Sequence, residues 1–493
     1  EVNNTQFIRY LAGISKSISK IKLGIENELE QNEWKSNQTD SLLNNSFSFS
    51  SYRFYIENAD STINQYSLSY KIRNDFLPSE NDLKKSTRAE DFQLGFSLLK
   101  NPSSILKTIV NYRRLEVQDT SIIQQQEENT LTGRLDYNFK LWKGAITSST
   151  FYEAGAGLEP KREYSFLRVS TGQGIYNWED YNSNGIAELD EFEIAQFQDQ
   201  ANYIRIYSPS NVYIKTYKNE FSQVFNIQPH TIWRLDKGLK KFLSKFSNNL
   251  AYQVNQKSTD ELLKQSLNPF NSYNDSTLIN ISQSFRNTFS FNRINSKFGV
   301  DYIYQNNASK ILLSNGFDQR NKINHGLKIR WKFISDFTFQ NYIELGKKNY
   351  ESQFFSIKNY ELDNLSNETK IQYQPGFQTK IELNYTFTKK NNSLANEKSN
   401  SHNIGTEINY SVSKKGNLLA KGNYLNISYN SDVNTSIAYE MLEGLKPGNN
   451  ATWNLTFQRK LTGYLEMNIL YNGRVSEKTK TIHTGSLQLR AFF

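Results

Sequence analysis

One short stretch of the chain, from Asp180 to Glu191, spaces oxygen-bearing side chains on either side of a glycine. The side chains that carry oxygen ligands are Asp180, Asn182, Asn184, Glu188 and Glu191. Calcium in proteins takes six to eight oxygens from carboxylates, amides and backbone carbonyls, and this spacing wraps such groups around one point. Gly185 permits the sharp backbone turn between the two groups. The stretch therefore predicts a site for a hard cation.

The same residues resemble the calcium loop of EF-hand proteins. The resemblance assigns the loop positions and implies that calcium is held by the side chains of Asp180, Asn182, Asn184, Glu188 and Glu191 and by the Ile186 carbonyl. Two features depart from the family: Ala187 replaces the usual bulkier aliphatic, and the preceding Thr171–Gly174 is a poor incoming helix. The alternative interpretation is an Asp- and Asn-rich turn without metal.

The elements around this loop have the period of β-strands. In segment after segment apolar side chains alternate with polar ones, which gives each strand one apolar and one wet face. The apolar set includes Leu135, Tyr137, Phe139, Trp331, Phe333, Leu383, Tyr385, Leu455 and Phe457. Their polar neighbours include Arg134, Asp136, Lys328, Arg330, Glu382 and Asn454. Such segments, counted between turns, predict an all-β fold: a closed, antiparallel, up-and-down transmembrane β-barrel of about 20–22 strands.

Composition agrees with a wall that is apolar outside and polar inside. Hydrophobic residues make up only 37% of the 493 residues, yet the chain has 30 Tyr and 32 Phe. No run of about 18 apolar residues occurs, whereas spanning strands need only about 10 alternating residues. A soluble β-sandwich is the alternative, but its turns recur every 8–12 residues, and here they are more widely spaced.

The final residues, Gly485 to Phe493, form an alternating strand that ends on an aromatic. This ending resembles the C-terminal signal of bacterial outer-membrane barrels. We therefore expect Phe493 to face lipid and Phe493→Asp to impair membrane insertion. Two stretches, Tyr176–Asn182 and Tyr439–Phe493, resemble large outer-membrane proteins of Bacteroidota. The resemblance implies an outer-membrane location and a barrel architecture, and little about activity.

One barrel is expected over residues 1–493, with an inserted loop over 171–210 that carries the calcium motif. Helical turns are expected over Phe192–Phe197. The basic stretch Lys237–Phe246 suits either the start of a strand or a contact with anionic lipid headgroups. Since the strands begin almost at once, no plug domain is expected, and loop insertions or partner proteins fill the lumen unless it is open.

No catalytic constellation is recognisable, so we expect no enzyme and no catalytic residues. Cysteine is absent, and the four histidines, at positions 230, 325, 402 and 483, have no metal-ligand spacing. The net charge of +9 is spread along the chain without a nucleic-acid-binding motif, so no nucleic-acid partner is expected.

Two functional hypotheses remain. The barrel is a structural or scaffolding subunit of an envelope complex, for secretion, outer-membrane assembly or surface-lipoprotein handling. Alternatively, it is a porin-like solute channel or transporter barrel. The expected partners are outer-membrane lipids and other envelope proteins, with calcium ordering the inserted loop.

Overall fold

The computed structural model describes residues 3–37, 39, 41–58, 63–123, 127–259, 267–270, 277–313, 316–412, 415–477 and 479–492. The chain divides into two compact units. The first contains residues 1–159, 215–225 and 253–277, and the second contains 160–214, 226–252 and 278–493. The terminal Phe493, predicted to face lipid, lies outside the described residues.

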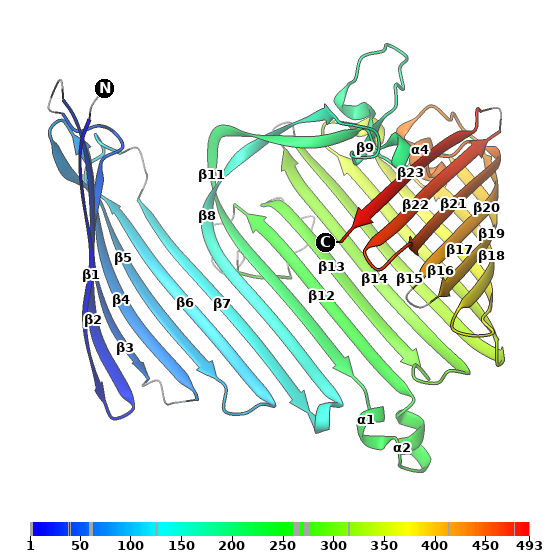
Figure 1. Ribbon diagram of the computed structural model, residues 1–493, viewed down its shortest axis with the longest axis horizontal. Helices are drawn as coiled ribbons and strands as arrows, with labels where there is room; N and C mark the ends of the chain where they lie inside the picture. Colours follow the sequence, from blue (N-terminus) through cyan, green and yellow to red (C-terminus); the bar gives the residue numbers. More distant parts are fainter. Residues whose placement is uncertain are drawn as a thin grey trace. The chain divides into compact units, whose positions relative to one another are not determined.

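In the first unit, consecutive strands pair with their sequence neighbours in antiparallel fashion (Figure 1). They are β1 (Asn3–Ile18), β2 (Ile21–Ser36), β3 (Phe47–Asn58), β4 (Gln65–Ser79), β5 (Asp82–Leu98), β6 (Ser104–Val117), β7 (Glu128–Leu141) and the first part of β8 (Ile146–Arg168). A 3-10 turn, η1 (Trp142–Gly144), joins β7 to β8. The strands β8, β11 (Tyr203–Ile227) and β12 (Phe246–Ser258) contribute residues to both units.

The register of the first unit aligns apolar side chains into rows. One row runs through Ile14, Ile25, Phe54, Tyr70, Phe92, Tyr112 and Leu131, one residue from each of seven neighbouring strands. The adjacent row, on the other face because strand side chains alternate, runs through Glu26, Arg53, Lys71, Asp91, Arg113 and Thr130. Phe54 and Phe92 are both nearly half exposed, so the described residues of the first unit leave this apolar face accessible.

The second unit continues the same pattern with longer connections. Its strands are β9 (Tyr176–Trp178), β10 (Phe192–Ile194), β13 (Leu278–Phe291), β14 (Phe298–Leu313), β15 (Gly316–Ile334), β16 (Phe337–Ser352), β17 (Tyr360–Tyr373), β18 (Thr379–Asn392), β19 (Lys398–Val412), β20 (Gly416–Tyr429), β21 (Gly448–Lys460), β22 (Leu465–Ser476) and β23 (Ile482–Ala491). Its helices are α1 (His230–Trp233), α2 (Gly238–Leu243) and α4 (Ser436–Leu442). Short 3-10 turns are η2 (Leu189–Glu191), η3 (Gln198–Gln200) and η4 (Ser356–Lys358).

The two faces of the second unit also separate by register. One apolar row joins Tyr410, Leu418, Phe457, Ile469 and Leu487. A polar row on the other face joins Glu382, Glu407, Lys421, Asn454, Asn472 and Thr484. The sequence-predicted apolar and charged sets thus lie on opposite faces of their strands.

Connections of the second unit alternate between two ends. At the loop end lie the β8–β11, β16–β17, β18–β19, β20–β21 and β22–β23 connections. At the turn end lie the shorter β13–β14, β15–β16, β17–β18, β19–β20 and β21–β22 connections, together with α1 and α2 between β11 and β12. A hydrogen bond of 2.9 Å from Phe492 N–H to the Tyr464 carbonyl places the last described residue at the turn end.

The sequence-predicted all-β class, with antiparallel strands in up-and-down order, is confirmed, and closure of these strands into a barrel stays a prediction. Apart from the three-residue strands β9 and β10, the described residues form 21 strands, within the predicted range. None of the described helices is long and apolar enough to cross a membrane. One local prediction was wrong: Phe192–Ile194 is a strand rather than a helical turn. The basic stretch Lys237–Phe246 leads into β12, which begins at Phe246, but Gly238–Leu243 within it forms α2.

Candidate functional site

The segment between β8 and β11, residues 169–202, departs from the regular wall of strands. Within it, β9 and β10 pair antiparallel, with Phe192 opposite Trp178 and Ile194 opposite Tyr176. A further hydrogen bond of 3.0 Å, from Glu179 N–H to the Glu191 carbonyl, closes the base of the hairpin. The sequence-predicted cation loop is therefore the tip of a hairpin, and its two ends are held together.

Inside the loop, side-chain oxygens accept hydrogen bonds from backbone N–H groups. The Asp180 carboxylate accepts hydrogen bonds from the N–H groups of Asn184 (3.1 Å) and Gly185 (2.9 Å). The side-chain oxygen of Asn184 accepts one from Ile186 N–H (2.6 Å). Gly185 has a φ of 74°, a left-handed conformation that favours glycine. The sharp turn expected at this glycine is confirmed.

The two glutamates of the motif have different surroundings. Glu188 is exposed, and its carboxylate accepts a hydrogen bond of 2.6 Å from the Asn182 side chain. Glu191 is only 2% exposed, and its carboxylate accepts bonds from the Trp178 indole (2.8 Å) and from the N–H groups of Tyr181 (3.2 Å) and Glu188 (3.3 Å). Glu191 therefore organises the base of the loop through N–H donors.

The loop fits a hard cation in donor type. Asp180, Asn182, Asn184, Glu188 and the Ile186 carbonyl bring only oxygen ligands to one hydrogen-bonded loop, as calcium requires. Glu191 fits less directly, because its carboxylate already accepts three N–H groups. Across the described ranges, no group of three or more His, Cys, Asp or Glu is arranged to hold a metal ion. The calcium site stays a prediction.

The inserted segment is fixed to the loop end of the second unit by a buried ion pair. Lys358 of η4 lies 2.8 Å from the Glu193 carboxylate and donates a hydrogen bond of 2.9 Å to the Phe192 carbonyl. Their side chains are 9% and 15% exposed. The same carboxylate accepts bonds from Ser436 at the start of α4 and from the Tyr181 hydroxyl. One carboxylate thus joins three connections that are distant in the sequence.

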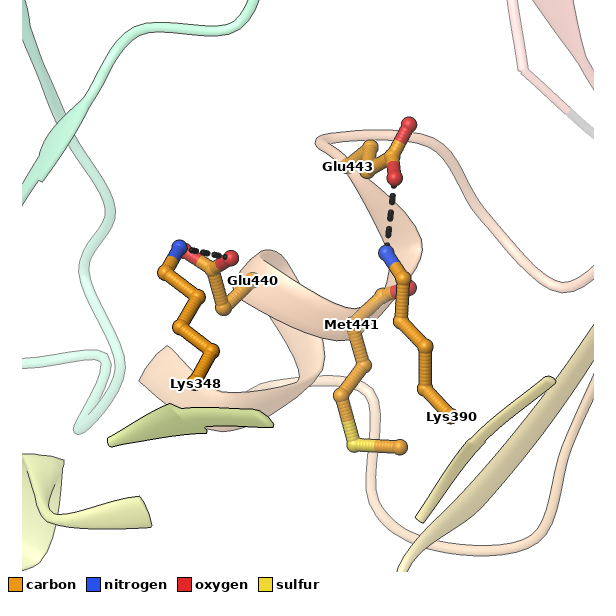
Figure 2. A network of polar contacts seen from close by, with 5 residues as sticks. All are labelled: Lys348, Lys390, Glu440, Met441 and Glu443. Carbon is orange, nitrogen blue, oxygen red and sulfur yellow. Dashed lines mark hydrogen bonds and ion pairs between the residues drawn. The ribbon is translucent and has the colours of Figure 1, made fainter. Parts of the chain in front are cut away.

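Helix α4 is held on the polar face of the strands (Figure 2). Lys348 of β16 pairs with Glu440, and Lys390 of β18 lies 2.7 Å from the Glu443 carboxylate. The Lys390 ammonium also donates a hydrogen bond of 3.1 Å to the Met441 carbonyl. Both lysines belong to the polar phase of their strands, so α4 lies over the wet face and not over the apolar one.

Apolar packing under α4 completes this attachment. Met441 packs with Tyr350, Tyr360 and Leu362 in one buried cluster. Ala438 and Leu442 pack with Ile427 and Leu445 in a second, against which Phe197 of the inserted segment also packs. The Thr435 hydroxyl caps the helix by accepting a bond of 3.1 Å from Ala438 N–H. The inserted segment and α4 therefore share one core.

The end of the inserted segment lies against the polar face of β20 to β23. Asp199 pairs with Arg474, whose guanidinium also lies 4.2 Å from the centre of the Phe197 ring. A cavity of about 280 Å³ remains between residues 196–199 and this face. Its polar lining includes Lys421, Asn454, Asn472 and Thr484, members of the polar row described above. The inserted segment thus covers part of the polar face.

Burial changes the acidity of groups at this junction. Burial raises the pKa of the Glu179 carboxyl, against the opposing charges of Lys446 and Arg474. Burial also raises the pKa of Tyr439 to about 12 and that of Tyr181 further. The Tyr439 hydroxyl accepts a hydrogen bond of 3.2 Å from Gln196 N–H. These tyrosines are neutral hydrogen-bonding groups, and the Glu179 carboxyl keeps its proton to a higher pH than an ordinary glutamate because its pKa is raised.

Three histidines have a shared arrangement on the apolar phase. In each, Nδ1 lies within hydrogen-bonding distance of a tyrosine hydroxyl on the preceding strand: 2.8 Å for His325 and Tyr302, 2.8 Å for His402 and Tyr385, and 2.9 Å for His483 and Tyr471. This arrangement suits an interfacial aromatic belt. The absence of enzymatic activity stays a prediction.

Sequence patterns missed the groups that fix the inserted segment. Lys358, Tyr439 and Arg474 lie far from the motif along the chain. One local signal was present: Thr435 as a cap, followed by apolar residues at 437, 438, 441 and 442, is typical of a short amphipathic helix.

No protein-family model matches the chain, and no curated protein matches it. Among solved structures, the chain is similar to the siderophore receptor PirA from Pseudomonas aeruginosa, with 9% identity over 97% of this chain and 74% of that chain, and a TM-score of 0.40. It is similar to the ferric-catecholate import receptor Fiu from E. coli K12 (8% identity, 95% and 75% covered, TM-score 0.33). It is also similar to OccK11 (OpdR) from Pseudomonas aeruginosa (12% identity, 90% and 94% covered, TM-score 0.33).

These similar structures are outer-membrane β-barrel proteins, the class and location predicted from the sequence. At such identities and TM-scores the likeness carries no information about substrate, partner or mechanism.

Proposed function

We propose that the chain is an integral β-barrel protein of the bacterial outer membrane. The observation that carries this proposal is the exposed apolar row of the first unit, set against the charged row on the opposite face of the same strands. Spanning barrels place lipid on one phase and water on the other. The Bacteroidota origin suggested by Tyr176–Asn182 and the C-terminal stretch belongs to the same proposal.

Two adjacent residues of β5 test the membrane assignment. Leu94, on the apolar phase, is half exposed, and Gln93 occupies the polar phase. Leu94→Lys is expected to destabilise the barrel by about 2–4 kcal/mol near mid-membrane, whereas Gln93→Lys is nearly neutral. The readout is heat-modifiable migration of outer-membrane fractions. Equal tolerance of both substitutions contradicts the proposal.

Within the membrane, we propose a structural role in an envelope complex. In support, the inserted segment is fixed by Lys358 and α4, and the connections joined to it expose apolar side chains to the surroundings. The exposed residues are Ile175, Ile186, Ile194, Phe354, Ile357 and Leu394. Contiguous exposed apolar patches mark protein-interaction sites, and the proposed role requires these side chains to form one. The loop end would then receive other envelope proteins.

Photo-crosslinking in cells tests this role. A photo-reactive residue in place of Ile357, at the loop end, is expected to give discrete crosslinks to envelope proteins. The matched control is Phe377, at the turn end and fully exposed. Absence of crosslinks from Ile357, or the same products from both positions, argues against a loop-end docking surface.

A solute channel is the second candidate, and the polar phase of β15 favours it. Five cations, Arg320, Lys322, Lys328, Arg330 and Lys332, follow one another there with one acid, Asp318. Within the described residues no ion pair joins Lys322 or Lys328 to a carboxylate. Rings or lines of cations favour anions in pores. Stable anion-selective conductance in planar bilayers supports the channel, and electrical silence supports the structural role.

We also propose that the loop from Asp180 to Glu191 binds calcium and thereby orders the tip of the inserted hairpin. Asp180→Asn removes one ligand charge but retains a carbonyl oxygen for the backbone bonds. Asp190→Asn, at a loop position that is not assigned as a ligand, is the matched control. Calcium is expected to slow proteolysis of residues 179–191 in the wild type and in Asp190→Asn, and to do so less in Asp180→Asn. If a chelator changes none of the three proteins, the loop is a turn without metal.

A further inference from the structure

The helix pair α1–α2 at the turn end is attached to the apolar face of the strands. The Phe242 ring of α2 lies 5.3 Å from that of Phe246 and 6.5 Å from that of Phe291, between ring centres. Phe246 in turn stacks on Phe289, a partner of Tyr302 on the apolar phase. A hydrogen bond of 2.8 Å from Asn292 N–H to the Lys245 carbonyl ties α2 to the β13–β14 turn. The helix pair therefore borders the apolar band.

Apolar side chains on this element are unusually exposed. Leu235 is 84% exposed and Leu239 is 72% exposed, and Ile294 of the adjoining turn is 70% exposed. Such exposure is costly in water, because it leaves apolar area hydrated. At the edge of a bilayer, the same side chains enter the acyl boundary.

Between α1–α2 and the β13–β14 turn lies a cavity of about 350 Å³ with a basic lining. Its lining includes His230, Arg234, Lys241, Lys245 and Arg293, and no Asp or Glu contributes. The Lys241 ammonium donates a hydrogen bond of 3.2 Å to the Arg234 carbonyl, which fixes it over the cavity. Throughout the described ranges, no ion pair links these five residues to a carboxylate. Within that part of the chain, the five basic side chains therefore have no carboxylate partner, and the cavity suits an anion.

We propose that this cavity binds the phosphate of an anionic phospholipid headgroup, with Leu235 and Leu239 in the acyl boundary beside it. The inference rests on the proposed membrane location and names a lipid class for it. Apolar anchors beside a basic cluster are the signature of an interfacial lipid site, and α2 provides both within six residues. The lipid then anchors the turn end of the second unit at one leaflet.

Lipid retention by the purified full chain tests the site. The protein is reconstituted in phosphatidylcholine nanodiscs containing about one fifth phosphatidylglycerol, re-extracted in mild detergent, and its bound lipid is measured by mass spectrometry. We expect phosphatidylglycerol to be enriched over phosphatidylcholine. Lys241→Gln and Arg293→Gln should each lower the enrichment about fivefold. The control Lys240→Gln should retain it, because Lys240 pairs with Asp236 and does not line the cavity.

Several outcomes overturn the proposal. Equal lipid ratios in the wild type and in Lys241→Gln, or an equal loss in Lys240→Gln, show that the cavity does not select the lipid. Glycerol 3-phosphate is also used to displace the bound phosphatidylglycerol. If it does so as readily from the wild type as from Leu239→Ser, the apolar anchor does not hold the lipid and the cavity is a site for free phosphate. Heat-modifiable migration is measured in the same samples. If the wild type lacks heat-modifiable migration, the proposed membrane location is wrong. If it migrates in this way but shows no lipid enrichment, only the lipid site is wrong.

Discussion

The two units use the same kind of ion pair in opposite surroundings. In the first unit Arg53 and Glu26 lie 3.1 Å apart on the polar row, with side chains about one third exposed. In the second unit Lys358 and Glu193 lie 2.8 Å apart, with side chains 9% and 15% exposed. Exposed pairs contribute little because water screens them, whereas a buried charge without its partner is costly. Although the two distances are similar, the exposed pair of the first unit contributes little to stability. The buried pair of the second unit fixes the inserted segment.

The largest expected loss of stability follows removal of the buried lysine, Lys358. Lys358→Met leaves the Glu193 carboxylate buried without its cation, at a cost of about 3–5 kcal/mol. The inserted segment should then detach from α4, seen as faster hydrogen exchange over residues 172–200. Lys322→Met, which removes an exposed lysine of β15, is the control. Unchanged exchange in Lys358→Met would contradict the assigned role.

Truncation of the apolar contact under α4 should have a slightly smaller effect. Met441 is 3% exposed in the cluster with Tyr350 and Tyr360, and Met441→Ala should weaken helix attachment by about 2–5 kcal/mol. Ile357→Ala, at a side chain that is 77% exposed, should change little. Proteolytic cleavage of the β20–β21 connection measures both. Equal cleavage rates in Met441→Ala and Ile357→Ala would mean that Met441 does not hold α4 in place.

A pH effect should be smaller again. Burial raises the pKa of Glu179, so the attached state binds more protons than the released state at pH values just above the ordinary glutamate pKa. Attachment of the inserted segment should therefore strengthen as pH falls from neutral toward that value. Glu179→Gln should remove this dependence. Hydrogen exchange of residues 172–200 at two pH values, in chelator, measures it, and a dependence that persists in Glu179→Gln assigns it to another group.

The smallest effect is expected on the wall of the first unit. Arg53→Ala breaks the pair with Glu26, and because both groups are hydrated the barrel should lose only about 0.2–1 kcal/mol. Thermal unfolding of Arg53→Ala beside Lys358→Met gives the comparison directly. A loss in Arg53→Ala as large as in Lys358→Met would mean that exposure does not separate the two pairs.

The strands were predictable because alternation is a local property. Side chains of residues such as Leu383 and Glu382 must point to opposite faces wherever the backbone is extended, so the apolar and polar phases follow from the sequence alone. The turn at Gly185 was predictable for the same reason, since only the local backbone requires its positive φ. The expected helical turns at Phe192–Phe197 failed because β10 pairs with β9, and a pairing across 13 intervening residues is not encoded locally.

The sequence by itself determined the alternating wall, the aromatic content and the oxygen-rich loop. Only the tertiary structure decided that Glu193 meets Lys358, that Asp199 meets Arg474 and that α4 lies on the polar face. It also assembled the basic cavity, since Lys241 and Arg293 come from different connections. Periodicity depends on neighbours two residues apart, whereas charge pairing and burial depend on which connections share an end of the sheet. The registers of many intervening strands fix that arrangement, and no local pattern specifies it.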